Sequence, residues 1–240
     1  MIKNYTLSDF RAEVKRRLNE TVNDGFWTTA ELNTKINKSL LRVCMDSRIM
    51  QRDIAINIGT NVSYYPLPVD TLIPQFIFGS SSNNFLNVRL FPSYMISWDK
   101  MYGGMYLWEK DSPNVPQEYV PFSYDHFILW PAPNFNDTVN LHDVPQPTVL
   151  INDYDTTQLP LVAQHLIPIY SSYLAMLKSD MQKAMGFLKE YKQRLISVRE
   201  LTRHQSKLRP STIVPGRSFD RSMANPSVRA YRNSRRYYGS

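Results

Sequence analysis

Residues 166–198 read LIPIYSSYLAMLKSDMQKAMGFLKEYKQRLISV, and this stretch decides how the chain folds. Apolar and aromatic residues recur in it at steps of three and four, and charged residues fill most of the positions between them. That period is typical of an amphipathic α-helix with one apolar stripe, and it predicts a continuous helix over about 160–204. The stripe consists of Tyr170, Tyr173, Leu177, Met181, Ala184, Leu188, Tyr191, Leu195 and Val198.

A helix of about 40 residues would be roughly 60 Å long at ~1.5 Å per residue, which is longer than the core of one domain requires. We therefore expect part of the stripe to pack against other copies of the chain. The residues predicted to pack between subunits are Tyr170, Tyr173, Leu177, Met181, Leu188, Tyr191 and Leu195.

Two shorter helices are predicted ahead of this stretch, over about 6–20 and 29–46. Each begins with a capping box, in which a threonine and the acidic residue three positions later satisfy each other's backbone N–H groups. Because short helices are marginal alone, we expect both to pack on the C-terminal helix. The two boxes are Thr6 with Asp9 and Thr28 with Glu31.

After residue 51, apolar residues recur at every second position, as they do in a β-strand. Ile54, Ile56 and Ile58 alternate with polar or small residues, Gly59-Thr60-Asn61 can turn the chain, and 62–65 returns, which predicts a β-hairpin. Further strands are predicted at 74–78, 85–91, 94–102, 105–109, 118–122, 126–130 and 138–142, with a two-residue turn at Gly103-Gly104.

The predicted fold class is α+β. It is a helical bundle of two short N-terminal helices and one long C-terminal helix, with an inserted β-rich region and an extended C-terminal tail. The four parts are the N-terminal helices at 1–50, the β-rich insertion at 51–155, the long helix at 156–206, which packs with the N-terminal helices, and the basic tail at 207–240.

Basic residues are concentrated near the C-terminus. Nine of the 28 lysines and arginines lie in residues 203–240 with a single acid, Asp220, so this segment carries a formal charge of +8. The rest of the chain holds 19 basic and 20 acidic residues. A nearly neutral body with a basic tail favours a tail that binds a partner, since the sequence of the body shows no accompanying basic patch.

No pattern typical of catalysis, cofactor binding or metal binding was found. None of the four histidines has another His or a Cys three to five residues away, as local metal-ligand pairs require. Asp153 and Asp155 could serve a hydrolase as a cation or acid–base pair, but Asp and Thr before a helix more often form a polar turn. We therefore predict a protein without catalytic, cofactor or metal sites, and not an enzyme.

The single cysteine, Cys44, excludes an internal disulfide and is expected to be buried, which fits folding in a reducing cytoplasm. The longest run without Asp, Glu, Lys or Arg, 156–177, contains Gln, His, Pro and Ser. It is too polar to cross a membrane, so no membrane partner is expected.

Three short motifs follow one another along the chain: TTAEL at 28–32 with Ile36-Asn37, GTNVSYYPLPVD at 59–70, and FILWPAP at 127–133, with Leu159-Pro160 leading into the long helix. In this order and spacing they resemble the head-to-tail adaptor, or connector, proteins of tailed bacteriophages, especially those of short-tailed, podovirus-like phages. The resemblance covers most of residues 6–200.

The resemblance implies a structural ring, typically a dodecamer, at the head–tail junction of the virion, assembled in the host cytoplasm. The ring would dock on the portal protein, contact tail nozzle or tail-hub proteins, and carry DNA through its channel during ejection. Its C-terminal segment would run onto the portal. The residues predicted to bind the portal are Arg209, Arg217, Phe219, Arg221, Arg229, Tyr231, Arg232, Arg235, Arg236, Tyr237 and Tyr238.

The basic tail also leaves an alternative open, a nucleic-acid-binding accessory protein of the virion whose tail contacts phosphates. The two functions differ in their dependence on salt. DNA affinity falls steeply with ionic strength when several phosphates are contacted. A tail buried on a protein should be less sensitive.

Overall fold

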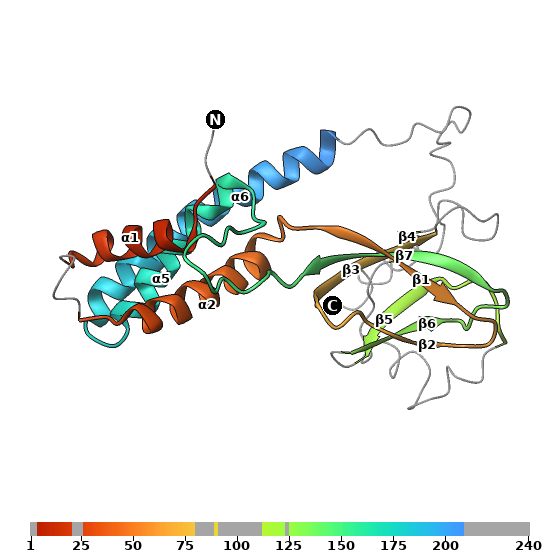
Figure 1. The fold of residues 1–240 in the computed structure, drawn as a ribbon. Coiled ribbons are helices and arrows are strands. Elements are labelled where there is room, and N and C mark those ends of the chain that lie inside the picture. The colour runs from red at the N-terminus through yellow and green to blue at the C-terminus, as the bar shows by residue number, and fades with distance from the viewer. Residues whose placement is uncertain (1–3, 21–25, 80–88, 91–111, 123–124, 209–240) are drawn as a thin grey trace, which may run out of the picture. The chain divides into compact units, whose positions relative to one another are not determined.

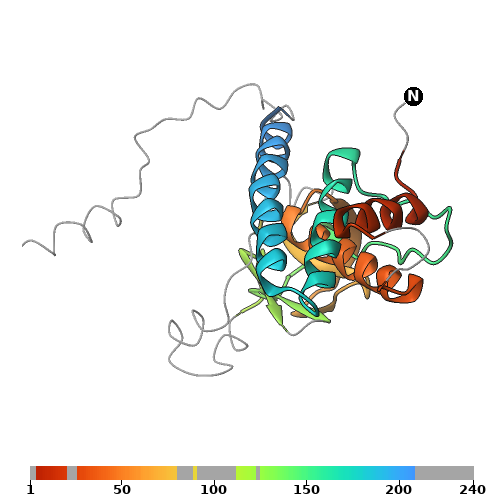
Figure 2. The ribbon, with the colours of Figure 1, turned by 90° about the vertical axis from the view of Figure 1, so that its left-hand side faces the viewer.

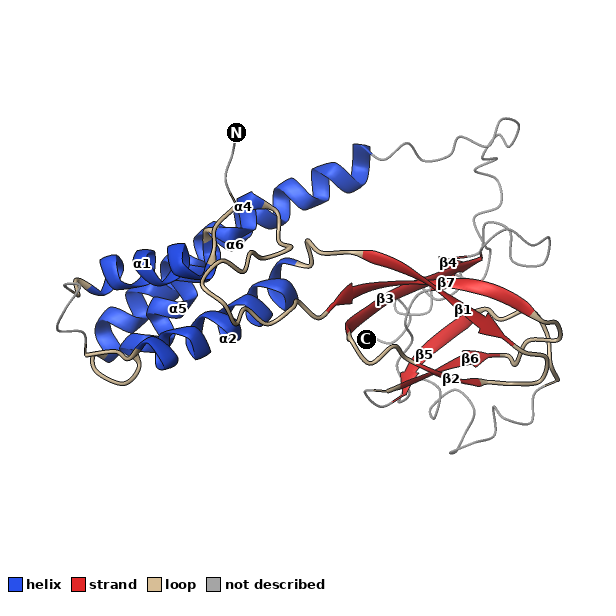
Figure 3. Ribbon diagram, viewed as in Figure 1, coloured by secondary structure: helices blue, strands red, loops and turns tan. Residues whose placement is uncertain are grey.

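The computed structural model describes residues 4–20, 26–79, 89–90, 112–122 and 125–208. The chain divides into two units, Met1–Arg203 and His204–Ser240, and the account below concerns the first. The predicted α+β class is confirmed (Figures 1 and 3). Helices share one hydrophobic core, and two antiparallel sheets share another.

The described helices are α1 (Leu7–Leu18), α2 (Thr29–Ser47), α4 (Leu161–Gln164), α5 (Leu166–Met176) and α6 (Met181–Leu208). Both predicted capping boxes are present. The hydroxyls of Thr6 and Thr28 accept the backbone N–H of Asp9 and Glu31, each at 3.2 Å, and each acidic side chain accepts the N–H of its threonine. These contacts fix where α1 and α2 begin.

The helices pack around α5, which contacts both α1 and α2. α6 lies alongside α5, where the rings of Tyr170 and Tyr191 are 4.8 Å apart (Figure 2). The central side chains lose all or nearly all contact with solvent, so their burial supplies most of the stabilisation of this part. They include Leu7, Phe10, Val14, Leu32, Ile36, Leu40, Val43 and Ile167.

The predicted continuous C-terminal helix is wrong, because a turn at 177–180 separates α5 from α6 and the chain folds back there (Figures 1 and 2). Asp180 causes the new helix start. Its carboxylate accepts the N–H of Lys183 at 3.0 Å, and its carbonyl oxygen accepts the N–H of Ala184 at 3.0 Å, as an N-cap residue does. The apolar spacing continues across the turn, so periodicity alone did not reveal it.

The first sheet has the strand order β1–β7–β3–β4 and the second the order β2–β6–β5, with all paired strands antiparallel. The strands are β1 (Arg52–Ile58), β2 (Tyr64–Pro66), β3 (Thr71–Gly79), β4 (Arg89–Leu90), β5 (Glu118–Phe122), β6 (His126–Trp130) and β7 (Asp137–Pro145). Both sheets contribute to one core, which includes Ile58, Tyr65, Ile77, Leu90, Tyr119, Phe127, Leu129 and Leu141.

The predicted hairpin between 54–58 and 62–65 is also wrong. β1 pairs with β7, with Ile56 opposite Val139, whereas β2 pairs with β6 in the other sheet. The turn itself forms, with Asn61 in the left-handed region at φ 61°, but it carries the chain from one sheet to the other. The partner of β1 lies far along the sequence, so a local alternation of residues could not identify it.

The other strand predictions have different outcomes. Those at 118–122 and 126–130 are confirmed as β5 and β6, and those at 74–78 and 138–142 lie within β3 and β7. The described part of 85–91 forms β4. The strands predicted at 94–102 and 105–109, and the turn at Gly103-Gly104, lie outside the described residues.

Candidate functional site

α6 is held on the bundle by one narrow stripe of its surface. Ala184, Tyr191, Leu195 and Val198 are buried, whereas most other described side chains of the helix are exposed. The Tyr191 hydroxyl donates a hydrogen bond of 2.8 Å to the carboxylate of Asp46, near the end of α2. Burial and the neighbouring carboxylate raise the pKa of Tyr191 far above its usual value. The phenol therefore stays protonated, and its hydroxyl can donate the hydrogen bond to Asp46.

Polar contacts between α6 and the helices α1 and α2 reinforce the packing of this stripe. Arg199 of α6 donates to the backbone carbonyl of Asp46 at 2.7 Å, and Arg42 donates to the carboxylate of Asp46 at 2.9 Å. Arg17 of α1 pairs with Glu190 of α6 at 3.3 Å. α6 is thus tied to both α1 and α2 through the side that faces the bundle.

A neighbouring side of α6 exposes large apolar side chains. Met181, Met185 and Ile196 are 63%, 53% and 57% exposed and share one side at helical spacing; we call these three residues the α6 flank. A Cβ atom added at Gly186 would meet no other atom within 4 Å, so the backbone beside Met185 is also open. Met181 and Met185 lie one turn apart, and Ile196 stands about three turns further along the helix, beyond Lys189 and Lys192. Exposed apolar side chains on one side of a helix are candidates for a protein–protein contact.

The residues predicted to pack between subunits fall into three groups. Tyr191 and Leu195 are buried inside this chain, and Leu177 and Met181 are exposed. Tyr170, Tyr173 and Leu188 are half-buried. Subunit packing stays a prediction for all seven, and the exposed pair has the most surface to offer a neighbour. The apolar stripe predicted from the sequence does not include Met185 and Ile196, although both lie on the same side of α6 as Met181.

Asp153 and Asp155 form part of the turn that receives the start of α1. The Asp155 carboxylate accepts the N–H groups of Asn152 and Ile151 at 2.8 and 2.7 Å, and these bonds lower its pKa. Asp153 pairs with Arg11 of α1. The backbone carbonyl of Asp155 accepts the N–H of Leu7 at 2.9 Å, and that of Asp153 accepts the N–H of Ser8 at 3.1 Å. Both side chains thus already have structural partners, and the turn predicted for them serves α1.

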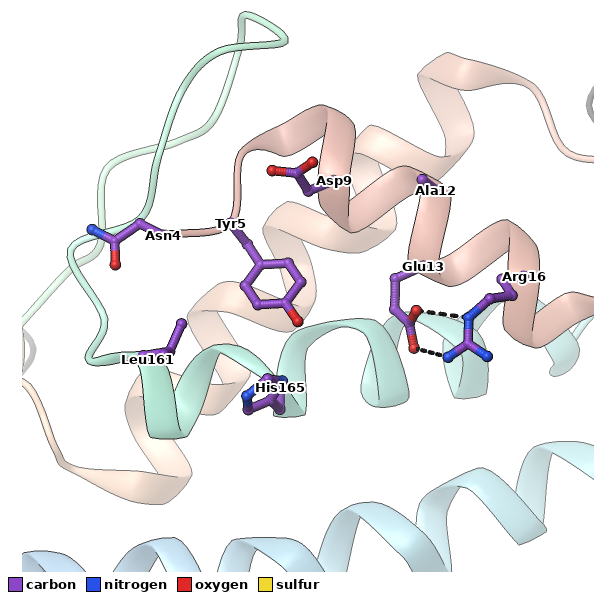
Figure 4. Close-up of a pocket in the computed structure, with 8 residues that line it drawn as sticks. All are labelled: Asn4, Tyr5, Asp9, Ala12, Glu13, Arg16, Leu161 and His165. Atoms are coloured by element: carbon purple, nitrogen blue, oxygen red, sulfur yellow. Dashed lines mark hydrogen bonds and ion pairs between the residues drawn. The ribbon is translucent and has the colours of Figure 1, made fainter. Parts of the chain in front are cut away.

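A groove of about 550 Å³ lies between α1, together with the residues just before it, and the α4–α5 segment (Figure 4). The ring of Tyr5 stacks on Phe10 and meets His165 edge-on, with ring centroids 5.5 Å apart in both pairs. On the other side Glu13 is held by Arg16, whose hydrogen bonds lower the pKa of that carboxylate. The groove therefore offers an aromatic wall and an ion pair, a lining that suits contact with a protein side chain.

Lysines and aromatic rings meet where the α1–α2 and α5–α6 connections come together. Trp27 is buried, and the ammonium groups of Lys35 and Lys178 lie 5.1 and 5.5 Å from its ring centroid. Burial lowers the pKa of Lys35. Lys178 also pairs with Glu31 at 3.3 Å, while Phe26 beside it is 66% exposed. These cation–π contacts and the ion pair brace the two connections against each other.

A second polar cluster stands where β1 begins. Asp143 of β7 is fully buried and accepts two hydrogen bonds from Arg52, both at 3.1 Å, and one from the Thr71 hydroxyl at 2.5 Å. Arg52 also pairs with the exposed Asp70 and lowers the pKa of that carboxyl. The buried charge of Asp143 is thereby compensated, and the cluster joins the starts of β1 and β3 to β7.

Four further observations bear on the sequence predictions. No group of three or more His, Cys, Asp or Glu that could hold a metal ion occurs within the described ranges. No described helix is long and apolar enough to cross a membrane. Cys44 is buried, and burial raises the pKa of its thiol to about 12. The predicted portal-binding residues, Arg209 to Tyr238, lie outside the described residues.

The described residues thus show two hydrophobic cores and an exposed apolar flank on α6. Residues 5–215 match the model of the SU10 adaptor protein family, so the chain belongs to this family. No functionally curated protein matches it. It is a structural adaptor of a bacteriophage, of a family that is not an enzyme family, with a place at the head–tail junction and with portal and tail proteins as partners. The sequence resemblance to phage adaptors is confirmed at that level.

Proposed function

We propose that the chain forms a closed ring, a dodecamer, that docks on the portal of a short-tailed, podovirus-like phage and joins it to the tail. The ring assembles in the host cytoplasm, contacts nozzle or tail-hub proteins below, and lets the genome pass through its channel during ejection. The observation that carries this proposal is the family match over residues 5–215. The exposure of the α6 flank supports it, because the side of α6 that faces the bundle is already buried within the chain.

The α6 flank suits the contact between neighbouring subunits. Burying a methionine or isoleucine side chain stabilises an interface by roughly 1.5–3 kcal/mol before the costs of association. Met181, Met185 and Ile196 would lose their exposed surface in such a contact. Because α6 is tied to α1 and α2 on its other side, it can present these residues from a rigid support.

The basic tail suits docking on the portal. The segment 203–240 carries +8 while the rest of the chain is nearly neutral. Arginine forks pair bidentately with carboxylates, and tyrosines bury large area at modest entropic cost. Portal binding is therefore assigned to the arginines and aromatic residues between Arg209 and Tyr238.

Mixing the purified chain with portal rings tests the proposal. The wild-type chain should add a second ring that is visible by cryo-electron microscopy, whereas the double variant Met181→Asp, Met185→Asp should remain unassembled. Gln182→Asp is the matched control, since it adds a charge at an exposed position of the same helix turn and should assemble normally. A wild-type chain that stays monomeric with portal present would contradict the proposal.

The charge of the tail also supports a second function, binding of nucleic acid by the tail. Salt distinguishes the two functions. If the tail contacts several phosphates, DNA affinity should fall by orders of magnitude between low and moderate salt. If the tail is buried on the portal, the complex should persist at salt concentrations that release DNA. Alanine at Arg232, Arg235 and Arg236 should weaken whichever of the two complexes is the physiological one.

A further inference from the structure

The sheet edges are protected unequally in the part of the chain that the structure describes. β2 is three residues long and ends in Pro66, β5 contains Pro121, and β4 is two residues long. β1 is an edge strand of seven residues, RDIAINI, with no proline and no glycine. Short length and proline are two of the usual protections against strand addition, and β1 has neither. Its charged residues, Arg52 and Asp53, stand at one end of the strand and are paired within the chain.

The backbone of β1 is ready to take another strand. It pairs with β7 in an unbroken register from Arg52 to Ile58, without a bulge that would twist the edge away. Among the described residues, nothing pairs with its other side. Every second residue of an edge strand points its N–H and C=O groups away from the sheet, so these groups remain available for hydrogen bonding.

The side chains of β1 indicate what an added strand should carry. Ile56 is half-buried against the core, Ile54 is half-buried on the same face by the alternation of the strand, and Ala55 and Asn57 are exposed on the opposite face. An incoming strand with branched apolar side chains would cover the open sides of the two isoleucines and extend the core of the two sheets. A purely polar segment would leave them uncovered.

The chain contains one segment of this kind beyond α6. Ser211-Thr212-Ile213-Val214 has β-branched residues at three of its four positions and stands between Pro210 and Pro215, which limit it to strand length. It belongs to the unit His204–Ser240, separate from the unit that holds β1. The family match extends past the end of α6 to residue 215 and so includes this segment, while residues 216–240 lie beyond the match.

We propose that Ser211–Val214 of one copy adds to the free edge of β1 in a second copy, so that the tail links neighbouring subunits before its arginine-rich end reaches the portal. Exchange of a short arm between identical chains is a general way to join them. The proposal goes beyond portal docking, because it requires two copies of the chain and no portal protein. Its failure can thus be told apart from failure of the proposed function.

Cross-linking between two chains that each carry one added cysteine tests the proposal in the full-length protein. One chain carries Ala55→Cys and the other Thr212→Cys, and a short bismaleimide that tolerates a shift in register joins nearby thiols. Native Cys44 should not react, since it is buried and its thiol pKa is raised to about 12. The matched control replaces Ala55→Cys with Val69→Cys, a fully exposed position outside β1.

The mixture of the two chains should give a covalent dimer that neither chain forms alone, and the Val69→Cys control should not. Adding Ile213→Pro to the donor chain should lower the yield at least about tenfold, because proline removes a ladder donor. Three results would overturn the proposal. They are no dimer in the mixture, an equal yield from Ala55→Cys alone, which would mean β1–β1 pairing, and, for a third chain that carries both added cysteines, cross-linking only within single chains.

Discussion

Two sides of α6 carry apolar residues and have opposite surroundings. The side formed by Ala184, Tyr191, Leu195 and Val198 is buried, and the polar groups around it are paired with α1 and α2. The α6 flank exposes Met181, Met185 and Ile196 beside it. The buried side therefore determines the stability of one chain, while the flank is free to determine assembly. Substitutions on the two sides should separate these two properties.

The largest loss of stability is expected for Tyr191→Ala. It removes a buried ring from the contact with Tyr170, and it removes the hydroxyl that donates a hydrogen bond to Asp46. Aromatic-to-alanine changes in a core cost about 3–5 kcal/mol. Denaturant unfolding should show this loss, and Tyr191→Phe, which removes only the hydroxyl, should cost about 1 kcal/mol. Equal losses from both variants would mean that the ring contributes little.

The neighbouring pair Leu195 and Ile196 provides the sharpest comparison of the two sides. Leu195 is 6% exposed and Ile196 is 57% exposed. Leu195→Ala should lower the free energy of unfolding by about 2–3 kcal/mol, whereas Ile196→Ala should change it by about 0.5 kcal/mol or less. Assembly with portal should show the reverse, with Ile196→Ala more defective at temperatures where both variants are folded. Similar unfolding losses for both would contradict the assignment of the two sides.

Alkaline pH should weaken the buried side. Burial and Asp46 raise the pKa of Tyr191 in the folded chain, while an unfolded tyrosine titrates near pH ~10. The stabilisation is complete below pH ~10 and falls above it, because the unfolded chain loses its proton first, by up to about 1.4 kcal/mol per pH unit. Unfolding at several pH values should show a shallower decline for Tyr191→Phe than for the wild type. Parallel curves would refute a neutral, buried Tyr191.

The smallest effect on stability is expected on the flank itself. Met181→Ala and Met185→Ala remove side chains that are more than half exposed. Each should change the free energy of unfolding by about 0.5 kcal/mol or less, as surface substitutions do. The double variant should nevertheless reduce ring formation, measured by the fraction of portal particles that carry adaptor density. Loss of stability without loss of ring formation would reverse the roles given to the two sides.

Local signals in the sequence predicted much of the fold. The two capping boxes and the strands β5 and β6 depend on residues within a few positions of each other, and all are confirmed. The break at 177–180 was missed because Leu177 and Met181 keep the helical spacing across a turn. The pairing of β1 with β7 was missed because alternation shows that a strand exists but not which strand lies beside it.

The candidate site was predicted less completely, for a related reason. A stripe of apolar residues does not reveal which of its members one chain buries for itself, and Tyr191 and Leu195 are used in that way. Met185 and Ile196 stand out only when burial on the finished fold is known. The motifs that resemble phage adaptors were more informative about function, and the family match confirmed them.

A cryo-electron microscopy reconstruction of the virion tests the central claim most directly. It should show a closed ring of this chain beneath the portal, with Met181, Met185 and Ile196 buried against a neighbouring subunit and Tyr191 still bonded to Asp46 within its own chain. A ring in which these three side chains face solvent, or a vertex without a ring of this chain, would contradict the account.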